Sequence, residues 1–168
     1  DHWTHDRTAG GGRILGEACH FIDLLHFLAD ESPIEQVTAL RHGADDTANC
    51  GDTMAISLRM ADGSLGQINY FANGVRSFPK ERLEVFSEGR VFRINNFRRL
   101  EGFGRRARGE RTWLQDKGHN AEMRAFVTAI RTGAESPIAF DSILNTTKAT
   151  LAVAEGTSRS PIDLARAA

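Results

Sequence analysis

The chain has 168 residues, of which 40% are hydrophobic and 26% are charged, which is enough for one sizeable globular core. Its formal net charge of −1 argues against an overall attraction to nucleic acid, and no apolar run reaches the roughly 20 residues of a membrane span. We therefore expect neither nucleic-acid nor membrane partners. Only Cys19 and Cys50 are present, which indicates no disulfide framework and predicts a cytoplasmic protein.

The stretch after the Gly10-Gly11-Gly12 run predicts a helix over residues 13–29, which the sequence Asp30-Glu31-Ser32-Pro33 would end. At about 100° per residue, one stripe of this helix collects Gly16, His20, Asp23 and Phe27, with Glu17 at its edge. Apolar residues cover most of the remaining surface, so we expect a helix buried nearly all round. A buried carboxylate or imidazole is costly unless it is paired or faces a wet cleft, which makes the stripe a candidate site.

The hydrophobic period then changes to that of strands, which we expect at residues 34–41, 53–60, 65–71, 82–87 and 91–94. In the second of these, Met54, Ile56, Leu58 and Met60 alternate with smaller or polar residues. Asp62-Gly63 and Glu88-Gly89 are hairpin signals. Residues 98–111 hold six arginines without a clear period, so we expect an exposed loop there that could include a short edge strand.

Two helices are expected near the end of the chain. The first covers residues 119–131 and is closed by Gly133. The second covers residues 142–155 after an Asp141 N-cap. We expect its inward face to consist of Ile143, Leu144, Thr147, Leu151 and Ala154. The tail at residues 161–164 would then return to the body of the protein.

This order of elements predicts an α+β fold, an open antiparallel sheet of about five or six strands with helices packed on one face. The other face would mix polar residues with Phe71 and Phe86. It could either meet water or pair with another subunit, and we expect a homo-oligomer through this sheet.

Several motifs are absent from the sequence. Gly10-Gly11-Gly12 is no dinucleotide fingerprint, because Leu15 stands where the third glycine is required and no strand precedes the run. The spacing of Glu17 and His20 occurs in di-iron bundles, but no second copy is present. His2, His5, Cys19 and Cys50 lack the paired spacing of a zinc site, so we expect no metal.

His20 has two interpretations from its spacing. It could exchange a proton near neutral pH, oriented by Glu17 or Asp23, or it could simply be a core histidine satisfied by those carboxylates. The arginine-rich segment could likewise bind an anion or be a solvated loop. Lys117 and His119 could meet an anion at a helix start, or His119 could merely sit near the cap.

The run from Gly10 to Leu25, GGGRILGEACHFIDLL, resembles the helix that opens the C-terminal domain of the Gfo/Idh/MocA family of NAD(P)-dependent oxidoreductases. The resemblance continues through the antiparallel strands and the late helix beginning HNAEMRAF at His119. Residues 16–23 are most similar to a branch in which such a domain is joined to a zinc-type alcohol dehydrogenase part.

The resemblance implies a Rossmann domain in cis ahead of residue 1, absent from this chain, with a glycine fingerprint and a Glu-Lys-Pro motif. It also implies that His20 serves proton transfer from a substrate hydroxyl. The family commonly carries an Asp four residues before this His, where the present chain has Gly16. Glu17 lies one residue later, about 100° round the helix. His20 would therefore work with another carboxylate or with water, or the branch has altered chemistry.

We therefore expect residues 1–168 to be the C-terminal substrate-binding and oligomerisation domain of a larger oxidoreductase, inactive by itself. The parent would act on a secondary alcohol or ketone of a sugar, polyol or sugar acid. The expected site consists of His20 for catalysis, Glu17, Asp23, Lys117 and His119 for substrate, and Gly16 beside an NAD or NADP held mainly by the missing domain. There are two alternatives: a non-enzymatic dimerisation or assembly module, and a free-standing sugar-binding domain.

Overall fold

The computed structural model describes residues 12–42, 53–75, 77–155 and 162–163. The chain divides into two compact units, one formed by residues 1–73 and 138–168 and the other by residues 74–137.

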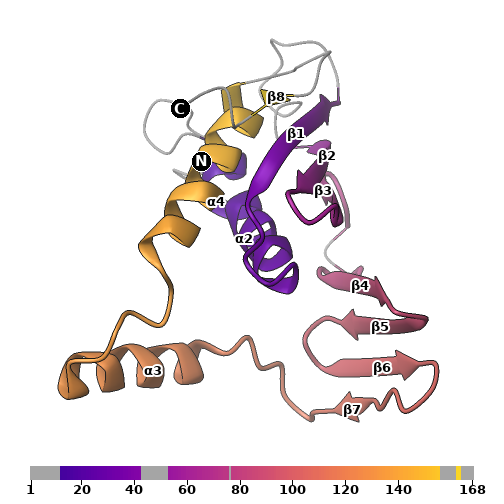
Figure 1. The fold of residues 1–168 in the computed structure, drawn as a ribbon. Helices are drawn as coiled ribbons and strands as arrows, with labels where there is room; N and C mark the ends of the chain where they lie inside the picture. Colours follow the sequence, from indigo (N-terminus) through magenta and orange to yellow (C-terminus); the bar gives the residue numbers. More distant parts are fainter. Residues whose placement is uncertain (1–11, 43–52, 76, 156–161, 164–168) are drawn as a thin grey trace. The chain divides into compact units, whose positions relative to one another are not determined.

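The first unit contains a four-stranded antiparallel sheet in the order β3-β2-β1-β8 (Figure 1). Its strands are β1 (Ile34–Arg41), β2 (Thr53–Met60), β3 (Leu65–Phe71) and the short β8 (Ile162–Asp163). The expected ends of the first three strands are confirmed, and the expected return of the tail is confirmed for the two residues of β8. Gly63, at φ 87°, makes the tight β2–β3 turn that its position in Asp62-Gly63 predicts.

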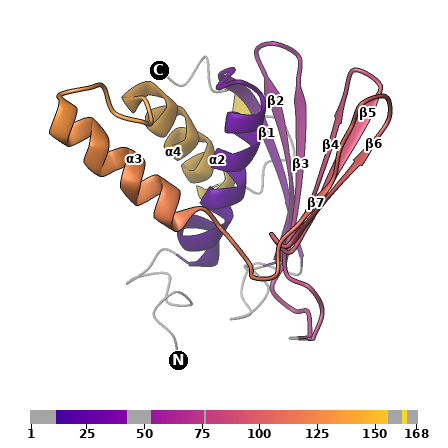
Figure 2. The ribbon, with the colours of Figure 1, turned by 90° about the horizontal axis from the view of Figure 1, so that it is seen from below.

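The core of this unit lies between the sheet and two helices, α2 (Cys19–Leu28) and α4 (Phe140–Glu155), which cover the same face of the sheet (Figure 2). The alternation expected along β2 is confirmed, because Met54, Ile56, Leu58 and Met60 are all buried. Ile56 is fully buried and lies opposite Ala39 of β1 and Ile68 of β3. The helices contribute a further set of buried apolar residues: Ile14, Ala18, Ile22, Ala149 and Val153.

The first helix is more exposed than the sequence predicted. It begins with the π-helical turn η2 (Ile14–Ala18) and continues as α2. Ile14, Ala18, Ile22 and His26 form its one buried face, whereas the predicted polar stripe is exposed. The expectation of burial nearly all round is therefore wrong for this chain, because only one side of the helix has the sheet and α4 to pack against.

The last helix is rotated relative to the expectation. Its buried residues are Ser142, Thr146, Ala149, Thr150 and Val153, whereas Ile143, Leu144, Thr147 and Leu151 are exposed. Asp141 lies in the first turn of the helix rather than before it. The predicted inward face was therefore wrong except at Ala154, which packs on the core. The small side chains let α4 lie close to α2 and β1, and the hydroxyl groups among them form hydrogen bonds there.

The second unit contains another four-stranded antiparallel sheet, in the order β4-β5-β6-β7, followed by α3 (His119–Thr132). Its strands are β4 (Arg82–Ser87), β5 (Arg90–Asn95), β6 (Arg99–Phe103) and β7 (Glu110–Arg111). Gly133, at φ 63°, closes α3 as predicted. The α+β class is thus confirmed, with the antiparallel strands arranged in two sheets instead of one.

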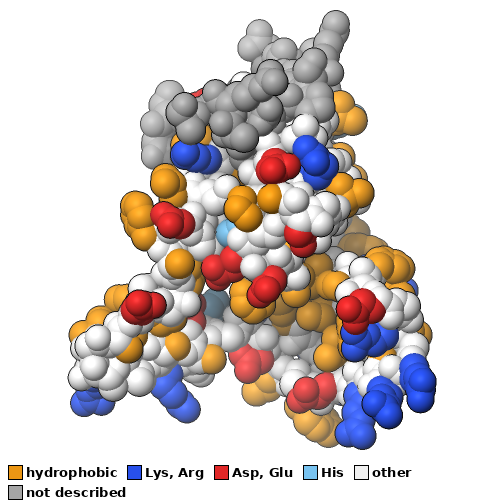
Figure 3. Space-filling model, viewed as in Figure 1, with side chains coloured by type: hydrophobic (Ala, Val, Ile, Leu, Met, Phe, Trp, Pro, Cys, Tyr) orange, Lys and Arg blue, Asp and Glu red, His pale blue; other side chains and the backbone are white. Residues whose placement is uncertain are grey.

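The arginine-rich segment contains the two strands β6 and β7, so the expectation of a loop is only partly right. The segment before β7 passes close to β6 and requires a glycine there, because a Cβ on Gly102 would lie 2.7 Å from the backbone oxygen of Arg108. The hydrophobic period did not reveal β6 because this short strand contains the charged residues Arg99 and Glu101, which lie opposite Asn95 and Arg93 of β5. Lys and Arg side chains gather over these strands on the surface of the unit (Figure 3).

Candidate functional site

The predicted stripe on the first helix is present on the surface of the first unit. Gly16, His20, Asp23 and Phe27 are all exposed, and Phe27 keeps 66% of its accessible surface. Glu17, at the edge of the stripe, is half-buried. The imidazole of His20 is therefore open to solvent and to any molecule that approaches this helix.

The stripe begins in the π-helical turn η2. The backbone N–H of Cys19 donates to the carbonyl of Ile14, five residues earlier, which is the π pattern. Such turns inside helices are frequent at functional sites. A Cβ built on Gly16 meets nothing within 4 Å, so the surface there has room for an incoming group.

Glu17 is held from the neighbouring strand by Tyr70 of β3. The Tyr70 hydroxyl donates a hydrogen bond to Oε2 of Glu17, and its half-buried ring lies 6.4 Å from the ring of Phe21. Burial and the Glu17 carboxylate both raise the pKa of Tyr70, while the Arg13 guanidinium acts in the opposite direction. The phenol therefore keeps its proton and remains a donor.

Two residues of α4 fix the polar side chains of α2. Thr146 Oγ1 donates to Oδ1 of Asp23 at 3.2 Å. His26, which is only 2% exposed, has its Nδ1 3.3 Å from Oγ of Ser142. His26 was not among the residues expected from the sequence, although its position four residues after Ile22 and eight after Ala18 places it on the buried face.

Lys117 and His119 belong to the second unit and are described there by themselves. Lys117 Nζ is paired with Oε1 of Glu81 at 2.6 Å and lies 5.6 Å from the centre of the Phe97 ring. His119 is the exposed first residue of α3. The predicted roles of Lys117 and His119 in binding substrate remain predictions.

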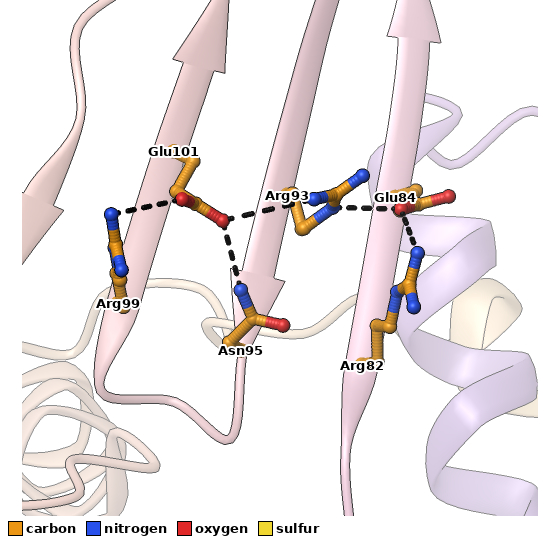
Figure 4. A network of polar contacts seen from close by, with 6 residues as sticks. All are labelled: Arg82, Glu84, Arg93, Asn95, Arg99 and Glu101. Atoms are coloured by element: carbon orange, nitrogen blue, oxygen red, sulfur yellow. Dashed lines mark hydrogen bonds and ion pairs between the residues drawn. The ribbon is translucent and has the colours of Figure 1, made fainter.

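Three arginines of the second unit, Arg82, Arg93 and Arg99, are engaged in a charge network on its sheet (Figure 4). Glu84 accepts from Arg82 at 2.6 Å and from Arg93 at 2.8 Å, and these two cations lower the pKa of Glu84. Glu101 joins Arg99 at 3.0 Å and Asn95 at 3.0 Å. Arg93 of β5 lies directly opposite Glu84 of β4 on one side and Glu101 of β6 on the other. The network therefore favours this strand register.

Within the described ranges, no group of three His, Cys, Asp or Glu residues is placed to hold a metal ion. His2, His5 and Cys50, considered in the sequence analysis, lie outside these ranges. Among the helices that the structure describes, none combines the length and apolar character needed to cross a membrane.

The first helix thus presents His20 and Gly16 at the surface, with Glu17 held from β3 by Tyr70. The chain belongs to the GFO/IDH/MocA C-terminal domain family, whose model matches residues 1–92. Among curated proteins, none matches the sequence. The branch joined to a zinc-type alcohol dehydrogenase part remains a prediction.

Solved structures share the fold at low sequence identity. Levoglucosan dehydrogenase in complex with NADH is 18% identical with a TM-score of 0.78, over 97% of this chain and 53% of that one. An NAD binding oxidoreductase from Klebsiella pneumoniae is 16% identical with a TM-score of 0.76, over 97% and 53%. UDP-N-acetylglucosamine 3-dehydrogenase from Acidithiobacillus ferrooxidans is 19% identical with a TM-score of 0.65, over 82% and 44%. The chain thus spans about half the length of the structures it resembles.

Proposed function

We propose that this chain is the substrate-binding half of an NAD- or NADP-dependent oxidoreductase and carries its catalytic histidine. The complete protein would oxidise a secondary alcohol, or reduce the ketone, of a sugar, polyol or sugar acid. Family membership supports an oxidoreductase, and the names of two similar structures, levoglucosan dehydrogenase and UDP-N-acetylglucosamine 3-dehydrogenase, support the substrate class. The exposed stripe around His20 is the observation that carries the proposal.

The residues present fit only part of a nicotinamide cofactor. The sequence has no glycine fingerprint for a pyrophosphate, but the open surface at Gly16 could accept a flat ring. A Rossmann domain in cis would hold the rest of the cofactor and cover the stripe, which leaves residues 1–168 inactive by themselves. The bound cofactor would accept or supply the hydride.

The chain's own residues would then orient the substrate hydroxyl and transfer its proton. The His20 imidazole would take the hydroxyl proton during oxidation and return it during reduction, which suits an imidazole near neutral pH. Glu17 would accept a hydrogen bond from a substrate hydroxyl and orient it. Asp23, held by Thr146, lies one helical turn after His20 and would support its charged form.

Lys117 and His119 are proposed as substrate contacts of the second unit taken by itself, suited to an anionic group such as the carboxylate of a sugar acid. Lys117 would have to exchange Glu81, its partner at 2.6 Å, for that group. Its Nζ is a mobile point charge at the end of a flexible chain, which makes such an exchange feasible.

Steady-state kinetics of the complete oxidoreductase test the proposal, with a panel of sugars, polyols and sugar acids and both nicotinamide cofactors. We expect His20→Ala to lower kcat by about 100-fold or more, since general acid–base catalysis contributes that much. The matched control is His42→Ala, which removes an exposed histidine outside the helix. A kcat for His20→Ala within about threefold of the wild type would contradict the catalytic role.

An assembly role is a second candidate, favoured by the exposed apolar residues Leu40 on β1 and Phe71 on β3 of the first unit's sheet. We propose that the complete protein forms a homo-oligomer, with the open sheet face as the contact. Sedimentation of the chain would give a concentration-dependent dimer. A monomer at all concentrations, together with a catalytic defect in His20→Ala, would exclude assembly as the main function.

A further inference from the structure

Tyr70 is the only tyrosine of the chain, and it lies on the helix-covered face of β3. Along this strand, Gly66 and Ile68 are buried and Tyr70 is half-buried, whereas Gln67 and Asn69 between them are exposed. The alternation directs the Tyr70 side chain toward the first helix.

Two contacts align the first helix with β3. A Cβ on Gly66 would lie 2.8 Å from Cδ1 of Leu25, so the helix packs closely on the strand at that point. At the other end, Tyr70 donates to Glu17. Gly66 and Tyr70 are four positions apart, a rise of about 13 Å in a strand, and Leu25 and Glu17 are eight positions apart, a rise of about 12 Å in a helix. Because the two rises agree, the packing itself brings the phenol to the carboxylate.

We propose that Tyr70 is a positioning residue, whose hydroxyl holds Oε2 of Glu17 so that the carboxylate stays beside His20 with Oε1 directed to a substrate hydroxyl. This inference rests on the proposed function, because it assigns Tyr70 to the same site.

Three features of the contact support this role. A hydrogen bond to a carboxylate is stronger than one between neutral groups, so it can restrain a flexible glutamate. The contact is formed at the edge of the core, where the Tyr70 ring packs against Phe21 and the buried cluster. Glu17 is also three residues before His20, and residues at this spacing are neighbours on a helix surface.

The first test concerns the contact alone and needs no activity. Since Tyr70 is the only tyrosine, the absorbance of its phenolate reports this residue during an alkaline titration of the chain. We expect the midpoint to lie above the ordinary tyrosine pKa and to fall in Glu17→Gln, because the carboxylate charge opposes ionisation of the phenol. The control Glu35→Gln, at a half-buried carboxylate on β1 that pairs with Arg59, should leave the midpoint unchanged. Circular dichroism at each pH verifies that the chain is folded.

The second test measures positioning in the complete oxidoreductase. Tyr70→Phe keeps the ring that packs on Phe21 and removes only the hydroxyl. We expect kcat/KM to fall about 10- to 100-fold, as displaced catalytic groups commonly cause, and to fall less than about twofold further when Tyr70→Phe is added to Glu17→Ala.

The outcomes separate the two proposals. An unshifted titration midpoint in Glu17→Gln overturns the contact, and an undiminished effect of Tyr70→Phe in the Glu17→Ala background overturns positioning through Glu17. If both results are as expected while His20→Ala retains its activity, the positioning role stands and the proposed proton transfer by His20 fails.

Discussion

Replacing Gly16 with alanine should stabilise the chain and weaken cofactor binding in the complete oxidoreductase. Gly16 lies inside the helical turn η2, its φ is outside the left-handed region, and an added Cβ would meet nothing within 4 Å. Glycine within a helix is less favourable than alanine by about 0.5–1 kcal/mol, because it loses more backbone entropy on folding. We therefore expect the free energy of unfolding to rise by about that amount.

Thermal and urea unfolding of the chain measure this gain. For a chain of this size, each kcal/mol corresponds to roughly 2–4 °C in Tm, so Tm should rise by about 1–4 °C. The urea m-value should stay unchanged, because the substitution alters neither the core nor the exposed area of the unfolded chain.

The matched control is Gly63→Ala in the β2–β3 turn of the same unit. This site is equally open, but its φ of 87° is unfavourable for any residue with a Cβ. We expect Gly63→Ala to destabilise by about 1 kcal/mol, opposite in sign to Gly16→Ala. A loss of stability in Gly16→Ala as well would refute the inference that the space beside η2 is open.

The activity of Gly16→Ala tests a separate step. If the nicotinamide ring lies against Gly16, an added methyl group should raise the KM for the cofactor about tenfold or more, since misplacement by about 1 Å can cost 100-fold. A more stable variant with an unchanged KM for the cofactor would contradict the cofactor contact while leaving the stability argument intact.

Two further predictions concern the core and the charge network. Ile56→Ala, at a fully buried position, should lower the free energy of unfolding in urea by about 2–5 kcal/mol. The control Leu40→Ala, at a 68% exposed position, should change it by no more than about 0.5 kcal/mol. Equal effects of the two substitutions would contradict the assignment of Ile56 to the core. In the second unit, Arg82 and Arg93 lower the pKa of Glu84, so the stabilisation it provides is complete above the ordinary carboxyl pKa and is lost as pH falls through the lowered value. The Tm of the wild type should therefore fall more on acidification than the Tm of Glu84→Gln, and the control Glu135→Gln should behave like the wild type. High salt should reduce the difference in Tm between the wild type and Glu84→Gln. Identical acid profiles for the wild type and Glu84→Gln would refute this role of Glu84.

The elements themselves could be predicted from the sequence because their signals are local. The alternation of Met54, Ile56, Leu58 and Met60 requires a strand with one buried face, and Asp62-Gly63 supplies the turn residue that the hairpin needs. The shared stripe of Gly16, His20 and Asp23 also followed from helical spacing alone. Each of these signals lies within a few consecutive residues.

Tertiary packing decided what local spacing could not. The sequence of α4 allows more than one inward face, and the small residues Ser142, Thr146 and Ala149 are buried because they let α4 approach α2 closely. Tyr70 and Glu17 are 53 residues apart, and His26 and Ser142 are 116 apart, so no local pattern could pair them. Periodicity shows which residues share a side of an element, but which side is covered depends on the neighbours that the folded chain brings to it.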